Sequence, residues 1–162
     1  MTVLAAIVGL IVGIVIAGLV FVWVMRNKFV VVRKAKGTFD EVCQRLEKAV
    51  EESDGWHFPV PTWEFYQSQT KAGFTFRNIR NLKKYFLCKS PHANAVVNDN
   101  AMWSAFLPCT WAVYEDMDGQ VYVAELNLPL MAMVMPGVLG RVLKEVVQEE
   151  EVMLKKGTGE GK

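Results

Sequence analysis

Two hydrophobic patterns divide the chain. Residues 3–25 form one unbroken apolar run without a polar face, and a basic run follows at once. From residue 28 onward, apolar positions recur at the spacings typical of short strands and amphipathic helices. This contrast predicts an anchor over residues 1–27 and one folded domain over residues 28–154. Residues 155–162 are Gly-rich and charged, which predicts a disordered tail.

The pattern within the domain predicts an α+β fold. Strands are expected near residues 28–34, 85–88, 110–115 and 120–126, with a hairpin turn at Asp118-Gly119. A capping box at residues 38–41 predicts a helix that ends near Gly55. Further helices are expected at about residues 64–70, 90–105, 127–134 and 138–154. This order predicts helices packed on a mixed or antiparallel sheet.

The apolar run is long enough to cross a lipid bilayer. A helix of about 23 residues rises roughly 35 Å, and a hydrocarbon core is about 30 Å thick. A cleaved signal peptide would need basic residues before the run and a small-residue site after it, and neither is present. A buried core helix would usually be shorter and have a polar face. The sequence therefore favours a retained single-pass anchor, with span about 3–25.

Charge predicts the orientation of this anchor. No Lys or Arg precedes the span, and several follow it closely: Arg26, Lys28, Arg33, Lys34 and Lys36. By the positive-inside rule, the N-terminus lies outside the cell (inner) membrane and the main domain is cytoplasmic. Trp23, Arg26 and Lys28 are expected at the membrane–water interface.

Small residues recur at helical spacing within the span, at Ala5, Gly9, Gly13 and Ala17. Such a stripe lets two helices approach closely in lipid. It predicts a homo-oligomer or a membrane-protein partner.

The charge and the cysteine content limit the kinds of partner and covalent link that can be expected. The formal charge is +1, and without the basic run it is about −4, so nucleic acid is not an expected partner. The basic run indicates that the lipid bilayer is a partner. The cysteines are Cys43, Cys88 and Cys109, an odd number without close pairing, which is not a disulfide framework.

Two segments resemble a known family. Tyr85–Pro91, followed by a helix of about 15 residues and then by Leu107–Glu115, resembles the DUF302 family. Lys71-x-Gly73 and the closing helix also match that layout, and the similarity covers roughly residues 28–154. The resemblance implies a small α+β domain of bacterial or archaeal origin that tends to pair as a homodimer. It assigns no activity.

Candidate chemistry lies where a strand meets a helix. Cys88 and His92 form a Cys-x3-His pair there, and the helix N-terminus would favour a thiolate or a bound anion. His92 could ligate a metal or haem iron (haem b), with Cys88 or a Met as second ligand. The alternative is structural, with Cys88 as core filler and His92 at a helix start. The resemblance also marks Cys109.

No catalytic constellation emerges, because no third, orienting residue accompanies a Cys-His pair. A Cys88–Cys109 disulfide is disfavoured if the two strands are parallel, because the thiols would then lie at opposite strand ends. Glu149-Glu150-Glu151 is interpreted as a solvated helix end, and Met131, Met133 and Met135 as core filler or a lid over an apolar cavity.

The leading hypothesis is a non-enzymatic binding or accessory module that serves a redox or respiratory membrane assembly. The alternatives are a haem or metal protein using His92, and a thiol redox protein using Cys88 and Cys109.

Overall fold

The computed structural model describes residues 2–160, apart from the side chains of residues 2, 4 and 5. The chain divides into two compact units between residues 30 and 31. The first consists mainly of helix α1 (Thr2–Lys28), which over Ala6–Lys28 is long and apolar enough to cross a membrane. Most of its described large apolar side chains are exposed, and a Cβ atom at Gly9 or Gly13 would meet no atom within 4 Å. The side chain of Ala5 lies outside the described part.

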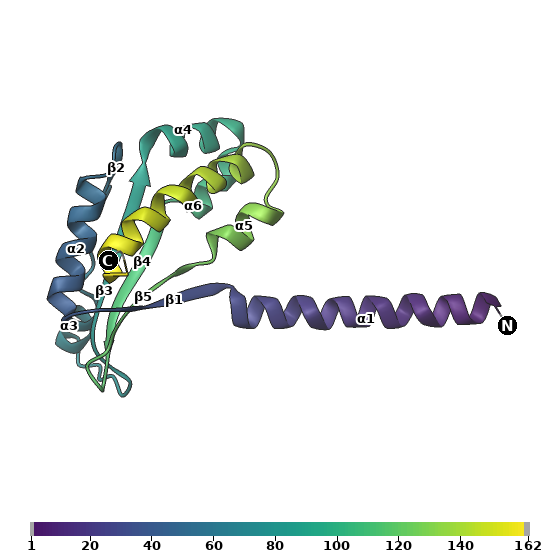
Figure 1. Ribbon diagram of the computed structural model, residues 1–162, viewed down its shortest axis with the longest axis horizontal. Helices are drawn as coiled ribbons and strands as arrows, with labels where there is room; N and C mark the ends of the chain where they lie inside the picture. The colour runs from purple at the N-terminus through teal and green to yellow at the C-terminus, as the bar shows by residue number, and fades with distance from the viewer. Residues whose placement is uncertain (1, 161–162) are drawn as a thin grey trace. The chain divides into compact units, whose positions relative to one another are not determined.

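The second unit is built on a five-stranded sheet in the order β1-β5-β4-β3-β2 (Figure 1). Its strands are β1 (Val30–Ala35), β2 (Trp56–His57), β3 (Ile79–Lys89), β4 (Cys109–Asp116) and β5 (Val121–Leu126). The pairs β2–β3, β3–β4 and β4–β5 are antiparallel. The predicted hairpin at Asp118-Gly119 is confirmed, and Gly119 has a positive φ of 84° that a non-Gly residue rarely adopts.

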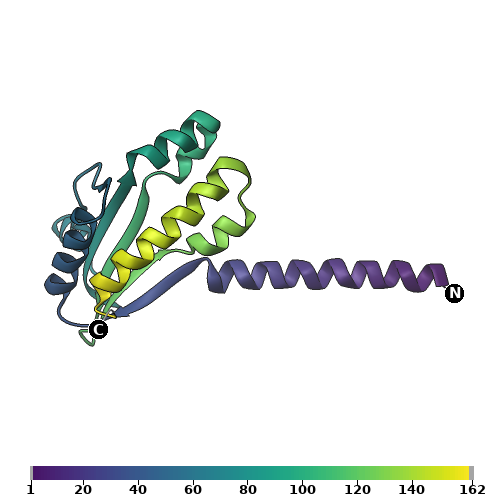
Figure 2. The ribbon, with the colours of Figure 1, turned by 45° about the horizontal axis from the view of Figure 1, so that its top comes forward.

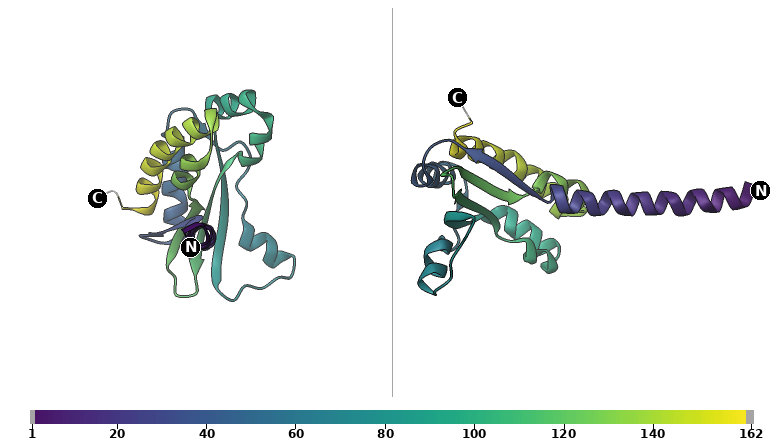
Figure 3. Two further views of the ribbon diagram at one scale, coloured as in Figure 1. Left: turned by 90° about the vertical axis from the view of Figure 1, so that its right-hand side faces the viewer. Right: turned by 90° about the horizontal axis from the view of Figure 1, so that it is seen from below.

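Helices α2 (Phe39–Glu51) and α6 (Gly137–Thr158) pack against each other and cover one face of this sheet (Figures 2 and 3). Shorter helices are α3 (Phe65–Lys71), α4 (Ser90–Asp99), the 3₁₀ helix η1 (Ala101–Phe106) and α5 (Leu128–Val134). The buried sheet residues include Tyr85, Leu87, Trp111, Val113 and Val123. The α+β prediction is therefore confirmed, with the core between the sheet and the two long helices.

Local signals were reliable where they involve neighbours in sequence. Thr38 and Glu41 form the predicted capping box, in which the Thr38 amide donates to Glu41 Oε2 at 2.9 Å. Asn127 caps α5 by accepting a hydrogen bond from the Leu130 amide at 2.9 Å. These contacts lie within one helical turn, so the sequence pattern contains both partners.

Strand β3 is much longer than the predicted strand over residues 85–88. Its first half is rich in polar residues, which hide the strand pattern. Lys83 Nζ lies 3.0 Å from Glu47 Oε1 and 2.9 Å from Glu64 Oε1, so its charge is neutralised by two carboxylates from outside the strand. These partners are distant in sequence, and no local pattern reveals them.

The predicted helix over residues 90–105 is interrupted. Helix α4 ends at Asp99, and Asn100 is extended, with φ −159° and ψ 117°. The Asn100 side chain accepts a hydrogen bond from the Met102 amide at 3.1 Å and so begins η1. An Asn that bonds the nearby backbone competes with the helix, which explains the break.

The prediction of a disordered tail is wrong for residues 155–158, because α6 continues to Thr158. Thr158 is buried, its hydroxyl donates a hydrogen bond to the Leu154 carbonyl at 2.8 Å, and its backbone carbonyl accepts one from the Lys36 amide at 2.9 Å. A Cβ atom at Gly157 would lie 2.2 Å from Leu46 Cδ2, so Gly157 permits the close approach of α6 to α2. Residues 161 and 162 of the predicted tail lie outside the described residues.

Candidate functional site

An apolar cavity of about 70 Å³ lies between one end of the sheet and helices α4, α5 and α6. Its walls are mainly aliphatic and include Leu87, Val96, Met131, Leu143 and Val146. Cys88 and His92 line it from the β3–α4 junction, and Cys109 from the start of β4. The structure therefore brings together all three residues that the sequence suggested, around one pocket.

The most unusual group in the pocket is Glu150 of α6. Its side chain lines the cavity and only 3% of its surface is exposed. Glu150 Oε2 accepts a long hydrogen bond of 3.4 Å from Trp111 Nε1, and Oε1 has no hydrogen-bond partner. Buried carboxyl oxygens are nearly always hydrogen-bonded, so this atom is available to a ligand.

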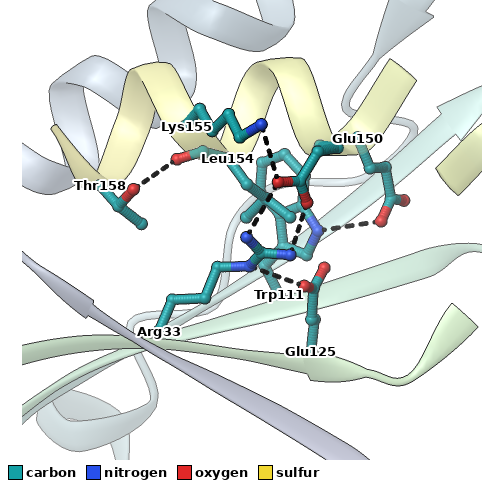
Figure 4. A network of polar contacts seen from close by, with 8 residues as sticks. Arg33, Trp111, Glu125, Glu150, Leu154, Lys155 and Thr158 are labelled. Carbon is teal, nitrogen blue, oxygen red and sulfur yellow. Dashed lines mark hydrogen bonds and ion pairs between the residues drawn. The ribbon is translucent and has the colours of Figure 1, made fainter. Parts of the chain in front are cut away.

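Arg33 of β1 lies beside this carboxyl but is bonded elsewhere (Figure 4). Its Nε lies 3.0 Å from Glu125 Oε1, and its Nη2 lies 2.7 Å from Glu151 Oε2. Lys155 Nζ adds a second cation 3.3 Å from Glu151 Oε1. Arg33 thus joins β5 to α6 and neutralises their carboxylates without bonding Glu150 directly.

Burial raises the pKa of Glu150 to about 7, and the nearby negative charge of Glu125 acts in the same direction. Hydrogen bonds from Cys109 and Trp111 and the charge of Arg33 oppose this shift but do not cancel it. Burial also raises the pKa of Glu125, against the effect of Arg33. Glu150 therefore exchanges its proton near neutrality, while neighbouring Glu151 has a lowered pKa because Arg33 and Lys155 outweigh its desolvation.

A second polar cluster borders the pocket on the α4 side. Glu149 accepts hydrogen bonds from Lys89 Nζ at 2.8 Å and Trp56 Nε1 at 2.5 Å. These bonds outweigh burial and lower the pKa of Glu149. His92 Nδ1 and Nε2 each lie 3.7 Å from a carboxylate oxygen, of Glu145 and Glu149 respectively. His92 Nε2 is buried and has no hydrogen-bond partner, so it too can meet a ligand.

The two pocket cysteines are closer than the sequence suggested. Because β3 and β4 are antiparallel and Leu87 pairs with Cys109, Cys88 and Cys109 lie at the same end of the sheet. The premise that they lie at opposite strand ends is therefore wrong, although both thiols are free in this structure. Burial raises the pKa of Cys88, and burial with the neighbouring Glu150 raises the pKa of Cys109 well above its usual value. The expected thiolate at the helix N-terminus is thus not favoured.

The metal and haem interpretations find limited support in this geometry. Within residues 2–160, no three His, Cys, Asp or Glu side chains converge to hold a metal ion. His92 borders the cavity with a free nitrogen, as an axial ligand would. A porphyrin is much larger than the cavity of about 70 Å³, so haem would require the surrounding helices to separate.

The comparison with protein families decides the identity of the domain. A family model described as "Domain of unknown function DUF302" matches residues 31–157. The chain belongs to the DUF302 family. The match covers the second structural unit almost completely, and the resemblance of the Tyr85–Pro91 and Leu107–Glu115 segments is confirmed.

A solved DUF302 structure shares this fold. It is the crystal structure of an uncharacterized conserved protein DUF302 from Bacillus stearothermophilus, with a TM-score of 0.68 and 18% sequence identity. The alignment covers 80% of this chain and 98% of that one. At this identity the likeness shows the fold alone. No curated protein matches the chain.

Sequence reasoning missed the central residue of the DUF302 pocket. Glu149-Glu150-Glu151 was expected to be solvated, yet Glu150 is buried. The helical spacing contained the signal: Val146 and Glu150 are four residues apart, and Leu154 follows after four more. All three positions lie within the helix expected over residues 138–154, so the three consecutive charges, and not the length of the helix, led to the wrong interpretation.

Glu150→Gln should become more stable than the wild type as the pH rises. A carboxyl whose folded-state pKa is about 7 stabilises the fold fully only below its unfolded pKa near 4.5, and this contribution is lost as pH rises through 7. The variant should gain up to about 3 kcal/mol relative to wild type between pH 4.5 and pH 8. Denaturant unfolding of the full chain in lipid nanodiscs measures this difference.

The matched control is Glu145→Gln on the same helix, whose side chain is 52% exposed. Its stability relative to wild type should change little over the same range. A pH-independent difference for Glu150→Gln would contradict the buried, protonated carboxyl.

Proposed function

We propose that this DUF302 protein is a non-enzymatic binding module, held at the membrane by α1, whose pocket binds a small and mainly apolar molecule. One observation carries the proposal: an aliphatic cavity is lined by Glu150, whose carboxyl oxygen Oε1 is buried and has no hydrogen-bond partner. Ligand sites typically combine apolar walls with a few polar groups that orient the ligand. The protonated thiols argue for binding rather than for thiol chemistry.

The anchor is the second part of the proposal. A helix with exposed apolar side chains at most described positions from Val3 to Met25 needs an apolar environment, and a bilayer provides one. The basic residues that follow it, including Arg26 and Lys28, favour the cytoplasmic side for the domain. We therefore place the DUF302 domain at the cytoplasmic face of the inner membrane, with the N-terminus outside.

Fusion reporters test this orientation. Green fluorescent protein at the C-terminus should fluoresce, because it folds in the cytoplasm, and alkaline phosphatase at the same position should be inactive. Replacing Arg26 and Lys28 with Glu, with two new Lys residues before Val3, should reverse or mix the signals. An active phosphatase fusion to the wild-type chain, or a mature chain that begins after Met25, would refute the proposal.

The stripe of small residues on α1 supports association of the anchor with a second copy or with another membrane protein. Gly9→Ile and Gly13→Ile should each reduce self-association severalfold in a membrane two-hybrid assay, because the branched side chain separates the helices. Gly18→Ile is the matched control, since residue 18 projects from nearly the opposite side of the helix. Equal signals for all three variants would remove the stripe as an interface. Membership of a redox or respiratory assembly stays a prediction.

The pocket can be tested with n-butanol as a probe. In full-length protein in zwitterionic nanodiscs, with ¹³C-labelled methionine methyl groups, n-butanol should shift the NMR signal of Met131, which lines the cavity. The signal of Met133 on the same helix should remain in place, because 81% of its surface is exposed.

Val146→Phe should abolish the Met131 shift by filling the cavity. Overpacking can destabilise a core by about 1–3 kcal/mol, so Ala93→Leu at the cavity wall provides a milder block. If n-butanol shifts neither methyl group in the wild type, or shifts both equally, the cavity is not a binding site.

A further inference from the structure

We infer that the pocket of this DUF302 domain selects a small amphiphilic amine, with its ammonium group at Glu150 and its aliphatic body against α5 and α6. The inference rests on the proposed function and specifies the class of ligand. It depends on three features of the described residues: the net charge of the groups around Glu150, the polar atoms at the cavity that have no hydrogen-bond partner, and the size of the cavity.

When Glu150 is ionised, the charged side chains around it include one more carboxylate than cation. Arg33 of β1 forms an ion pair with Glu125 of β5. Arg33 and Lys155 both form ion pairs with Glu151 of α6. These four groups balance one another, although Lys155 is 56% exposed and acts weakly. From β4, the Cys109 thiol and the Trp111 indole contribute hydrogen bonds without charge. The cluster is therefore neutral when Glu150 is protonated and carries one uncompensated negative charge when it is ionised.

The α4 side of the pocket does not provide the missing cation. Lys89 lies there, but its Nζ is bonded to both oxygens of Glu149. His92, if protonated, lies between Glu145 and Glu149, which would compensate it already. A positively charged ligand would therefore neutralise the ionised Glu150. An anionic ligand would instead be repelled by the carboxylates around the pocket.

Geometry limits the rest of the ligand. Glu150 Oε1 is buried and unpartnered, and the walls beside it are aliphatic. A cavity of 150 Å³ holds the six carbons of benzene, so by proportion the cavity of about 70 Å³ encloses about three carbons of an unbranched chain. The pocket is partly open, so a chain of about four carbons can extend beyond it. Ammonium groups donate up to three hydrogen bonds, and a carboxylate is their natural acceptor. The Coulomb attraction between two opposite charges is also greater where water is excluded than at the surface.

The experiment compares three probes of one size, n-butylamine, n-butanol and butyrate, by the Met131 methyl shift in the full chain at pH 8. We expect n-butylamine to bind at least 10-fold more tightly than n-butanol, and butyrate to bind weakest. The preference for the amine should fall at pH 5.5, because Glu150 is then protonated while the amine keeps its charge. Met133 reports any unspecific partitioning.

Glu150→Gln should abolish the preference for the amine while n-butanol still binds, and Glu145→Gln should preserve it. An unchanged Met131 signal in the ligand-free Glu150→Gln variant shows that the pocket is intact. If n-butanol or butyrate binds the wild type as tightly as the amine, the ligand class is wrong, although the pocket remains a binding site. If no probe shifts Met131, the proposed function fails as well.

Discussion

The contact of helix α6 with the sheet depends on side chains that recur every three or four residues along the helix. Its buried members are Leu139, Gly140, Val142, Leu143, Val146, Glu150, Met153, Leu154, Gly157 and Thr158. Packing this stripe buries the core of the domain and at the same time places one carboxyl group where water cannot reach it. The stability of the fold and the chemistry of the pocket therefore arise from one surface. A change that lifts α6 from the sheet would expose Glu150 and abolish the pocket together.

A buried carboxylate without a cation is costly, and the domain reduces that cost in two ways. Glu150 holds its proton up to about neutral pH, and Trp111 and Cys109 donate hydrogen bonds to it. Arg33 would be the obvious counter-ion, but it is fully occupied by Glu125 and Glu151.

The contacts of Arg33 also change the argument for the orientation of the anchor in the membrane. Arg33 belongs to the folded domain and not to a free juxtamembrane run, so the positive-inside argument depends mainly on Arg26 and Lys28.

The parts of the fold that could be predicted are those whose partners lie close in sequence. The capping box at Thr38 and the β4–β5 hairpin each need only a few neighbouring residues, and both were found. The first half of β3 was missed because Lys83 is stabilised by Glu47 and Glu64, which lie in other elements. Sequence reasoning did find three residues of the pocket, Cys88, His92 and Cys109, because they flank a strand–helix junction and a family motif. It missed Glu150 because a run of three glutamates resembles a solvated surface, although Glu150 lies on the same helix face as Val146 and Leu154.

The arrangement of these groups explains why a cysteine, a histidine and a glutamate around one cavity favour binding over nucleophilic catalysis. A thiol nucleophile needs a base that removes its proton, or surroundings that lower its pKa. Here the group that contacts Cys109 is Glu150, whose negative charge adds to burial in raising the pKa of the thiol, while the hydrogen bond from Cys109 lowers the pKa of Glu150. In the described residues the ionic contacts of His92 are with Glu145 and Glu149 at the rim, not with a thiol. The negative charge of Glu150 that keeps Cys109 protonated would also attract a cation, so the group that disfavours a thiolate is the one that would hold an amine.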